Sequence, residues 1–384
     1  MKHKLCVLAV SGALSAWHGT TTAATAVTLY GVLDVPIEYV NRVAASAATP
    51  NAGGSRFAMP GVGGLSASRW GMRGTEELGS GTQALFVLEG GFNADTGAAL
   101  SSGLFSRVAM VGLKKAGVGQ ITLGRQTTSL LDGLVNFSPL RFAATYEPGI
   151  WWMGLNYRES NMVKYTGQFG QVQAVAHYSF GTGVPALAAG NLLANGGAGE
   201  NPAHHKDNTA YGASVMYLDG TFGLGVGYDR WNPAITSGQT AKVEKISVGG
   251  SYATGPLKFS AGYRWNKGDF ANGNTFLRDD YWWAGVNYKA TPALGLSLAY
   301  FYADVKRAAA TPTSAPTSPP NMQQYTFLAD YNFSKRTDVY LAVGYAHNGS
   351  LSFDSAATAY AFNYPSMAGQ KNMVGVITGI RHIF

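Results

Sequence analysis

The chain has 384 residues and a formal net charge of +7, and only 13% of its residues are charged, about half the fraction typical of soluble domains. Its 46% hydrophobic and 12% aromatic residues exclude a disordered chain. It lacks the run of about 20 apolar residues that a membrane helix requires, so a membrane-spanning form would be a closed β-barrel. A soluble all-β protein stays open as the alternative.

The N-terminus has the three parts of a secretory signal peptide. Two lysines precede the apolar stretch 5–17, and residues 24–26 read Ala-Thr-Ala, a typical small-residue cleavage site. We expect cleavage after Ala26, with Ala24 as the alternative. The predicted organisation is a signal peptide, 1–26, followed by one exported domain, 27–384.

Cysteine usage excludes several kinds of chemistry. Cys6 is the only cysteine, and it lies inside the apolar stretch of the signal peptide, too early to be a lipoprotein acylation site. The exported domain therefore has no disulfide, thiolate or cysteine–metal site, and it keeps a mildly positive net charge.

Apolar and polar residues alternate with period two from residue 27 to the end, which predicts an all-β chain. On the first predicted strand, 27–40, one face is apolar and suits lipid, and the other is mixed and suits a wet lumen. The apolar face reads Leu29, Gly31, Leu33, Val35, Ile37 and Tyr39, and the mixed face Thr28, Tyr30, Val32, Asp34, Pro36 and Glu38. The segments 172–180 and 257–265 divide in the same way.

Short and long connections alternate along the chain. The short ones are 77–81, 115–117, 168–170, 219–220, 254–255, 290–292 and 334–336, each with turn-competent residues. The long ones are 41–64, 94–103, 127–155, 181–208, 232–241, 268–276, 307–321 and 348–370. Eight long loops and seven short turns predict a 16-stranded antiparallel transmembrane β-barrel, wide enough for an aqueous channel.

The last predicted strand ends on an aromatic carboxylate. Its outer face carries Val374, Val376, Thr378, Ile380, His382 and Phe384, and Phe384 resembles the C-terminal signal read by the machinery that inserts barrels. A soluble sandwich or solenoid would carry many charged residues on its outward face, whereas both faces are charge-poor here.

Seven blocks together resemble the general porins of Gram-negative proteobacteria, in particular the neisserial and burkholderial type. They are VTLYGVLDVPIEYVN at 27–41, SRWGMRGTEELGSGTQALFVLEGGFN at 68–93, LFSRVAMVGL at 104–113, GQITLGRQ at 119–126, MVKYTGQFG at 162–170, YNFSKRTDVYLAVGY at 331–345 and VGVITGIRHIF at 374–384. The resemblance implies an outer-membrane homotrimer, one pore per barrel, and a third loop folded inward as a constriction. It also implies contact with outer-membrane lipids, lipopolysaccharide and the barrel-assembly machinery.

In such a channel, charges that face the lumen would select ions. Strand phase turns a set of basic residues inward, Arg381 among them. The set predicted for the pore wall is Arg69, Arg73, Arg107, Arg125, Arg158 and Lys164, of which the resemblance assigns the first four to a basic ladder. The alternative is that single arginines pair with carboxylates such as Glu89 or extend to an interface.

The third long loop contains Asp132, Arg141 and Glu147, and the resemblance makes the two acids candidates for the face opposite the basic wall. The loop departs from the family where it reads Glu-Pro-Gly-Ile-Trp-Trp-Met at 147–153. Trp151 and Trp152 could line the constriction and favour aromatic anions, or they could pack the loop against the wall. Packing is favoured, because adjacent residues of an extended segment point opposite ways.

The predicted function is passive diffusion of small hydrophilic solutes and ions, with anions preferred and a possible tuning to organic carboxylates. No cofactor, metal site or nucleic-acid partner is expected, because no hydrolase, zinc or phosphate-loop motif occurs in the sequence. An outer-membrane phospholipase is the enzyme alternative, and an adhesin or phage receptor acting through the external loops is the third class.

Overall fold

The structure is a computed structural model that describes residues 26–101, 103–184, 187–188, 191–192, 199–236, 238–354 and 363–384. The predicted signal peptide lies outside these ranges, except that Ala26 is the first residue of β1 (Ala26–Ala44). Among the helices within these ranges, none is both long and apolar enough to cross a bilayer.

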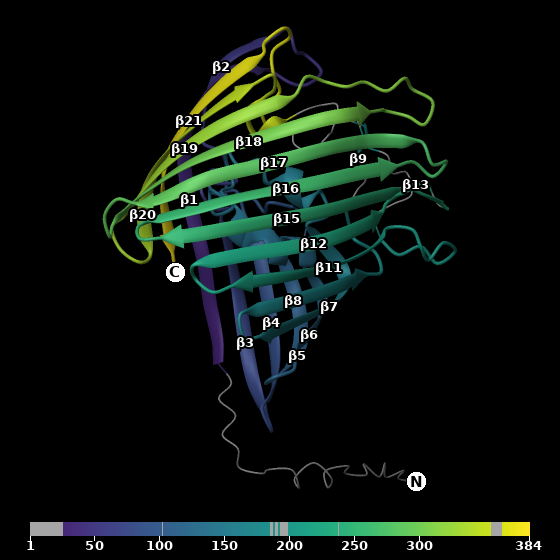
Figure 1. Ribbon diagram of the computed structural model, residues 1–384, viewed down its shortest axis with the longest axis vertical. Coiled ribbons are helices and arrows are strands. Elements are labelled where there is room, and N and C mark those ends of the chain that lie inside the picture. Colours follow the sequence, from purple (N-terminus) through teal and green to yellow (C-terminus); the bar gives the residue numbers. More distant parts are fainter. Residues whose placement is uncertain are drawn as a thin grey trace, which may run out of the picture.

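Sixteen antiparallel strands form a closed ring in which each strand pairs with its neighbours in sequence and the last pairs with the first (Figure 1). After β1 the ring contains β3 (Arg69–Gly79), β4 (Thr82–Gly91), β5 (Val108–Lys115), β6 (Gly119–Thr127), β7 (Arg158–Phe169), β8 (Val172–Ser179), β11 (Thr209–Leu218), β12 (Phe222–Asn232), β15 (Lys242–Thr254), β16 (Leu257–Asp269), β17 (Thr275–Lys289), β18 (Leu294–Ala308), β19 (Met322–Asn332), β20 (Thr337–His347) and β21 (Asn372–Ile383). The predicted strand number is confirmed.

The remaining strands lie within the long loops. β2 (Gly53–Ala58) pairs with the far end of β1, and two small hairpins are formed by β9 (Leu187–Ala188) with β10 (Asn191–Leu192) and by β13 (Ala234–Thr236) with β14 (Gln239–Thr240). The seven short turns gather at one end of the cylinder and the eight long loops at the other, as predicted (Figure 1).

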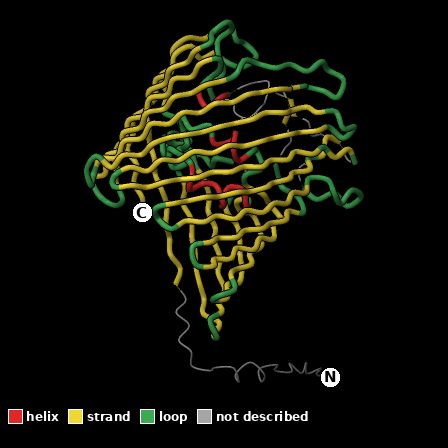
Figure 2. Tube along the Cα trace, in the orientation of Figure 1, coloured by secondary structure: helices red, strands yellow, loops and turns green. Residues whose placement is uncertain are grey.

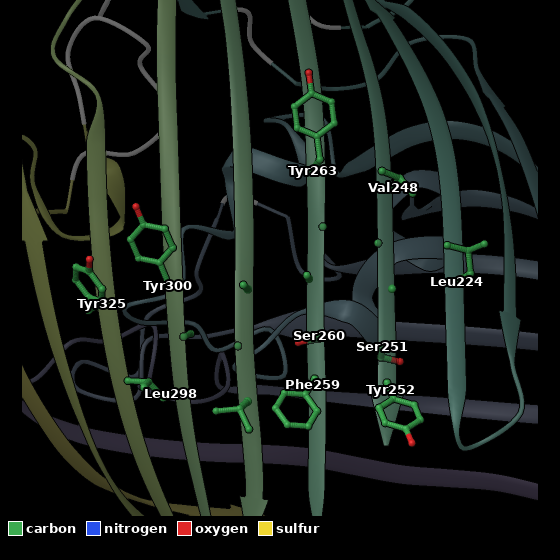
Figure 3. Close-up of a pocket in the computed structure, with 18 residues that line it drawn as sticks. Leu224, Val248, Ser251, Tyr252, Phe259, Ser260, Tyr263, Leu298, Tyr300 and Tyr325 are labelled. Atoms are coloured by element: carbon green, nitrogen blue, oxygen red, sulfur yellow. The ribbon is translucent and has the colours of Figure 1, made fainter. Parts of the chain in front are cut away.

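The two faces of the wall follow the predicted alternation. On β1, Leu29 and Ile37 are exposed on the outside, whereas Asp34 and Glu38 are buried on the inside. A shallow apolar hollow of about 970 Å³ lies on the outer face across β12 and β15–β19. Figure 3 shows Tyr252 and Phe259 below this hollow, near the short turns, and Tyr263 at its other end. Small residues between aromatic rings fit a wall that faces lipid.

The third loop, 128–157, folds into the barrel. It forms α1 (Ser129–Leu134), η1 (Val135–Phe137) and α2 (Gly149–Met153), and these helices lie inside the outline of the strands in Figure 2. They contact β8, β11, β12, β15 and β16. A Cβ at Gly225 would lie 2.5 Å from the Phe137 ring, so the loop rests directly on the strand backbone. The inward third loop is thus present.

Candidate functional site

The centre of the third loop is an aromatic cluster. Trp151 packs 5.8 Å from Phe353 of η2 (Leu351–Phe353), a turn in the eighth loop, and Trp152 lies 6.2 Å from Trp283 of the wall. The two indoles are only 0% and 2% exposed. The segment is helical rather than extended as the sequence reasoning assumed, and the wall and η2 cover both rings. The tryptophans therefore offer no aromatic surface to the lumen.

Two of the predicted wall arginines share one carboxylate. Nε of Arg107 lies 2.6 Å and Nε of Arg69 lies 3.6 Å from the carboxylate of Glu89. The Tyr30 hydroxyl also donates to Glu89, at 3.1 Å. The pairing that the sequence analysis kept as an alternative thus occurs at these two positions.

Two further arginines, Arg158 and Arg381, lie near Arg107 and Arg69. Arg158 stacks 4.7 Å from the Tyr157 ring centre and lies close enough to Arg107 and Glu89 to interact electrostatically. Arg381 in turn interacts with Arg69, and its Nε lies 3.0 Å from Asp338. We call Arg69, Arg107, Arg158 and Arg381 the arginine group. Its four guanidinium groups have two carboxylates, Glu89 and Asp338, as ion-pair partners in the described part of the chain.

Arg125 has a different set of contacts from the arginine group. It is paired across the ladder with Ala109, on the same side of the sheet as Leu123, which is 50% exposed on the outer face. Its Nε donates to the backbone carbonyl of Ser106 at 2.6 Å and its Nη1 to Ser160 Oγ at 2.9 Å. Opposite residues of a ladder project to the same face, so this register contradicts the predicted lumen phase of Arg125.

The other predicted basic residues each have a local partner. Arg73 lies over the Tyr30 ring at 5.4 Å near the short-turn end of the wall. Nζ of Lys164 lies 2.7 Å from Asp132 in α1, so this acid of the loop is in direct contact with the wall rather than facing it across an opening.

Glu147 is buried within the third loop and does not face the arginine group. Its carboxylate accepts hydrogen bonds from Ser138 Oγ at 2.5 Å and from the Ala143 backbone N–H at 3.0 Å. Burial raises the pKa of Glu147 to about 7. Arg141 is exposed at the loop surface, 3.5 Å from Asp330 of the wall. Glu147 therefore holds the loop's own shape, whereas Arg141 joins the loop to the wall.

A polar cavity of about 390 Å³ lies where the third loop meets the first, second and eighth long loops. Its lining includes Arg56 and Glu38, which are 3.2 Å apart, and Tyr364, whose hydroxyl donates to Glu38 at 2.7 Å. Charged and hydroxyl groups thus line part of this cavity, and such groups suit hydrated solutes.

Sequence reasoning missed a buried charged cluster under the third loop, formed by Glu159, His177, Asp229 and Lys245. Alternation alone placed His177 on the mixed face of its strand. The other three lie on β7, β12 and β15, and only the register of four strands brings them together. The sequence signal that could have revealed this cluster is a titratable residue at an inward position of each of the four strands.

Comparison with known proteins gives a consistent result. A family model described as Gram-negative porin matches residues 6–351. The chain is 29% identical to an outer membrane porin protein of Bordetella pertussis, covering 98% of this chain and 99% of the relative. It is 28% identical to outer membrane porin protein 32 of Delftia acidovorans, over 100% of both chains.

Solved structures give the same fold. An anion-selective porin from Comamonas acidovorans superposes with a TM-score of 0.72 at 24% identity, covering 94% of this chain and 100% of that chain. OmpT of Vibrio cholerae, solved in a trimer form, gives a TM-score of 0.63 at 16% identity over 94% and 100%.

The family model spans most of the chain, and the solved porins superpose on the barrel over 94% of its residues. Family and fold are those of an outer-membrane channel rather than of an enzyme. The chain belongs to the Gram-negative porin family.

Proposed function

We propose that this porin passes small hydrophilic anions in preference to cations, and that the arginine group carries the preference. The supporting observation is that, within the ranges that the structure describes, the four guanidinium groups have two carboxylates as ion-pair partners, Glu89 and Asp338. Lys164 and Arg141 contribute little, because each lies beside a carboxylate. The excess positive charge raises the local concentration of anions and lowers that of cations.

The likeness to the anion-selective porin from Comamonas acidovorans supports the same preference. The narrower prediction of a channel tuned to aromatic carboxylates is not proposed, because its basis was the tryptophan pair and both rings are buried. Passive diffusion of small anionic solutes is the function that we propose.

We further propose that the protein is a homotrimer, on the family resemblance and on the trimer form of OmpT. Its exposed apolar outer face would contact outer-membrane lipids and lipopolysaccharide. The backbone of Phe384 exchanges hydrogen bonds with that of Gly31 in β1. The barrel-assembly machinery would recognise Phe384 during insertion.

The test is the reversal potential of the purified protein in planar bilayers under a salt gradient. We expect an anion-selective wild type and a lower anion-to-cation permeability ratio in Arg158→Gln, because Arg158 has no ion-pair partner among the described residues. Arg125→Gln is the matched control, and we expect it to leave the ratio unchanged. A cation-selective wild type, or an effect of Arg125→Gln alone, would contradict the proposal.

A further inference from the structure

The charged cluster under the third loop lies against both ends of that loop. Glu159, His177, Asp229 and Lys245 come from four strands of the wall, and their side chains are between 0% and 1% exposed. The outgoing end of the loop contacts the cluster through Ser129, the first residue of α1, and the returning end through Asn156.

His177 holds the outgoing end. Its Nδ1 accepts a hydrogen bond from the Ser129 backbone N–H at 3.1 Å and lies 2.8 Å from Ser129 Oγ. The first N–H groups of a helix have no partner within the helix, so a buried acceptor at this position stabilises its start. Ser129 is also bound from the other side, because Ser214 Oγ donates to its carbonyl at 2.7 Å.

The returning end is held by amide and ammonium groups. The Asn156 side-chain NH₂ donates to Glu159 Oε1 at 2.8 Å and to Asp229 Oδ1 at 2.9 Å. Lys245 Nζ donates to Asn156 Oδ1 at 2.7 Å and lies 2.7 Å from Asp229 Oδ1. One connected set of contacts therefore joins Ser129 and Asn156 to the wall.

The hydrogen bonds at Nδ1 of His177 also determine whether Nε2, which faces Glu159 and Asp229, can bind a metal ion. Nε2 lies 3.3 Å from Glu159 Oε2 and 3.7 Å from Asp229 Oδ2, a spacing that could hold a metal ion. A ring nitrogen that accepts a hydrogen bond carries no hydrogen, so the neutral ring carries its hydrogen on Nε2, between the two carboxylates. The lone pair that a metal would need is then absent, and the ammonium of Lys245 beside Asp229 opposes a second cation.

We propose that His177 is the positioning residue of the constriction: it fixes α1 to the wall through Ser129 while Glu159 and Asp229 hold its ring. The consequence is that the position of the third loop, and with it the width and charge of the opening, depends on a side chain that permeating solutes do not contact. This inference needs the channel proposed above only for its current readout.

The test compares substitutions that keep or remove the contact with Ser129. His177→Asn keeps an acceptor near the position of Nδ1 and loses the Nε2 hydrogen, whereas His177→Phe keeps a ring and loses both. A spin label on Asn136→Cys, an exposed position of η1 directly after α1, reports loop motion, with Cys6→Ser removing the only native cysteine. We expect His177→Phe to raise the mobile fraction of the label about tenfold, and His177→Asn to raise it much less.

Ser129→Pro gives the same test from the loop side and leaves the wall intact. Proline suits the first position of a helix, and Thr128 has the extended backbone (φ −72°, ψ 159°) that a residue before proline prefers. It removes the N–H and the hydroxyl together, so we expect label mobility and open-channel current noise to rise as in His177→Phe. The same substitution at an outer residue, His347→Phe, is the control and should change neither.

Two results would overturn the proposal. One is a label that stays as immobile in His177→Phe and Ser129→Pro as in the wild type. The other is equal mobility in His177→Asn and His177→Phe, which would mean that the ring only fills space. Both readouts come from the label and stand even if the channel proves to have no anion preference.

Discussion

Replacing Glu89 by Gln removes the negative charge that Arg69 and Arg107 share. The three groups together carry one net positive charge in the wild type and two in the variant. Gln keeps the size of the side chain and an oxygen that can accept from Arg107 and Tyr30, so the barrel should fold as before. We therefore expect a channel with a stronger preference for anions.

The size of the effect follows from Coulomb's law. One added charge at about 6 Å from a permeating ion in water is worth about 0.7 kcal/mol, and screening at about 0.1 M salt lowers this to about 0.4 kcal/mol. The change has opposite signs for anions and cations, so it counts twice in their ratio. The permeability ratio should rise about fourfold at this ionic strength, and much less at about 1 M salt.

Reversal potentials measured at both salt concentrations check this prediction. Glu76→Gln, on the same hairpin but exposed near the short turn, is the matched control and should change the ratio little. An unchanged or lower anion preference in Glu89→Gln would refute the reasoning, because it would place the shared carboxylate outside the field felt by permeating ions.

Three further predictions concern the third loop. Gly225→Leu should displace the loop and change the single-channel conductance, because its Cβ would lie 2.5 Å from Phe137. Gly250→Ala is the control and should leave the conductance unchanged, because the atom nearest to its Cβ would be 3.4 Å away. Histograms of single-channel conductance distinguish the two variants. Trp151→Ala should lower the free energy of unfolding by about 3–5 kcal/mol, measured by denaturant titration in detergent, and a loss below about 1 kcal/mol would contradict its buried position. Glu147 has a folded-state pKa of about 7 against an ordinary value of 4.5, so the folded protein binds its proton more tightly. The contribution of Glu147 to stability should therefore be full below pH 4.5 and be lost as the pH rises through 7, and Glu147→Gln should make the decline in thermal unfolding curves smaller.

The sequence predicts the barrel well because the signal is local. Period-two alternation assigns Leu29 and Asp34 to opposite faces, and two or three turn residues mark each short connection, so the strand number follows without any tertiary contact. Glu89 was expected only as the partner in the alternative to a free basic wall, and the hairpin of β3 and β4 brings it to Arg69.

The interior is harder to predict because its contacts join distant segments. Trp151 is covered by Phe353, and His177 meets Asp229 and Ser129 only once four strands and a loop are in place. Arg125 is a different case, because plain alternation from Leu123, two residues earlier, gives the outer face that the register with β5 shows. The inward assignment gave weight to the positive charge rather than to the period of the strand.

The double pairing of β1 has a consequence for how the barrel forms. The start of this strand pairs with β3 nearby in the chain, but its middle pairs with β21, and Gly31 and Phe384 exchange backbone hydrogen bonds of 3.0 and 3.1 Å. Joining ends that are several hundred residues apart costs about 5 kcal/mol of chain entropy, which no local hairpin has to overcome. Closure should therefore be the last and slowest step of folding, and until then β1 and β21 expose unpaired edges open to pairing with another chain.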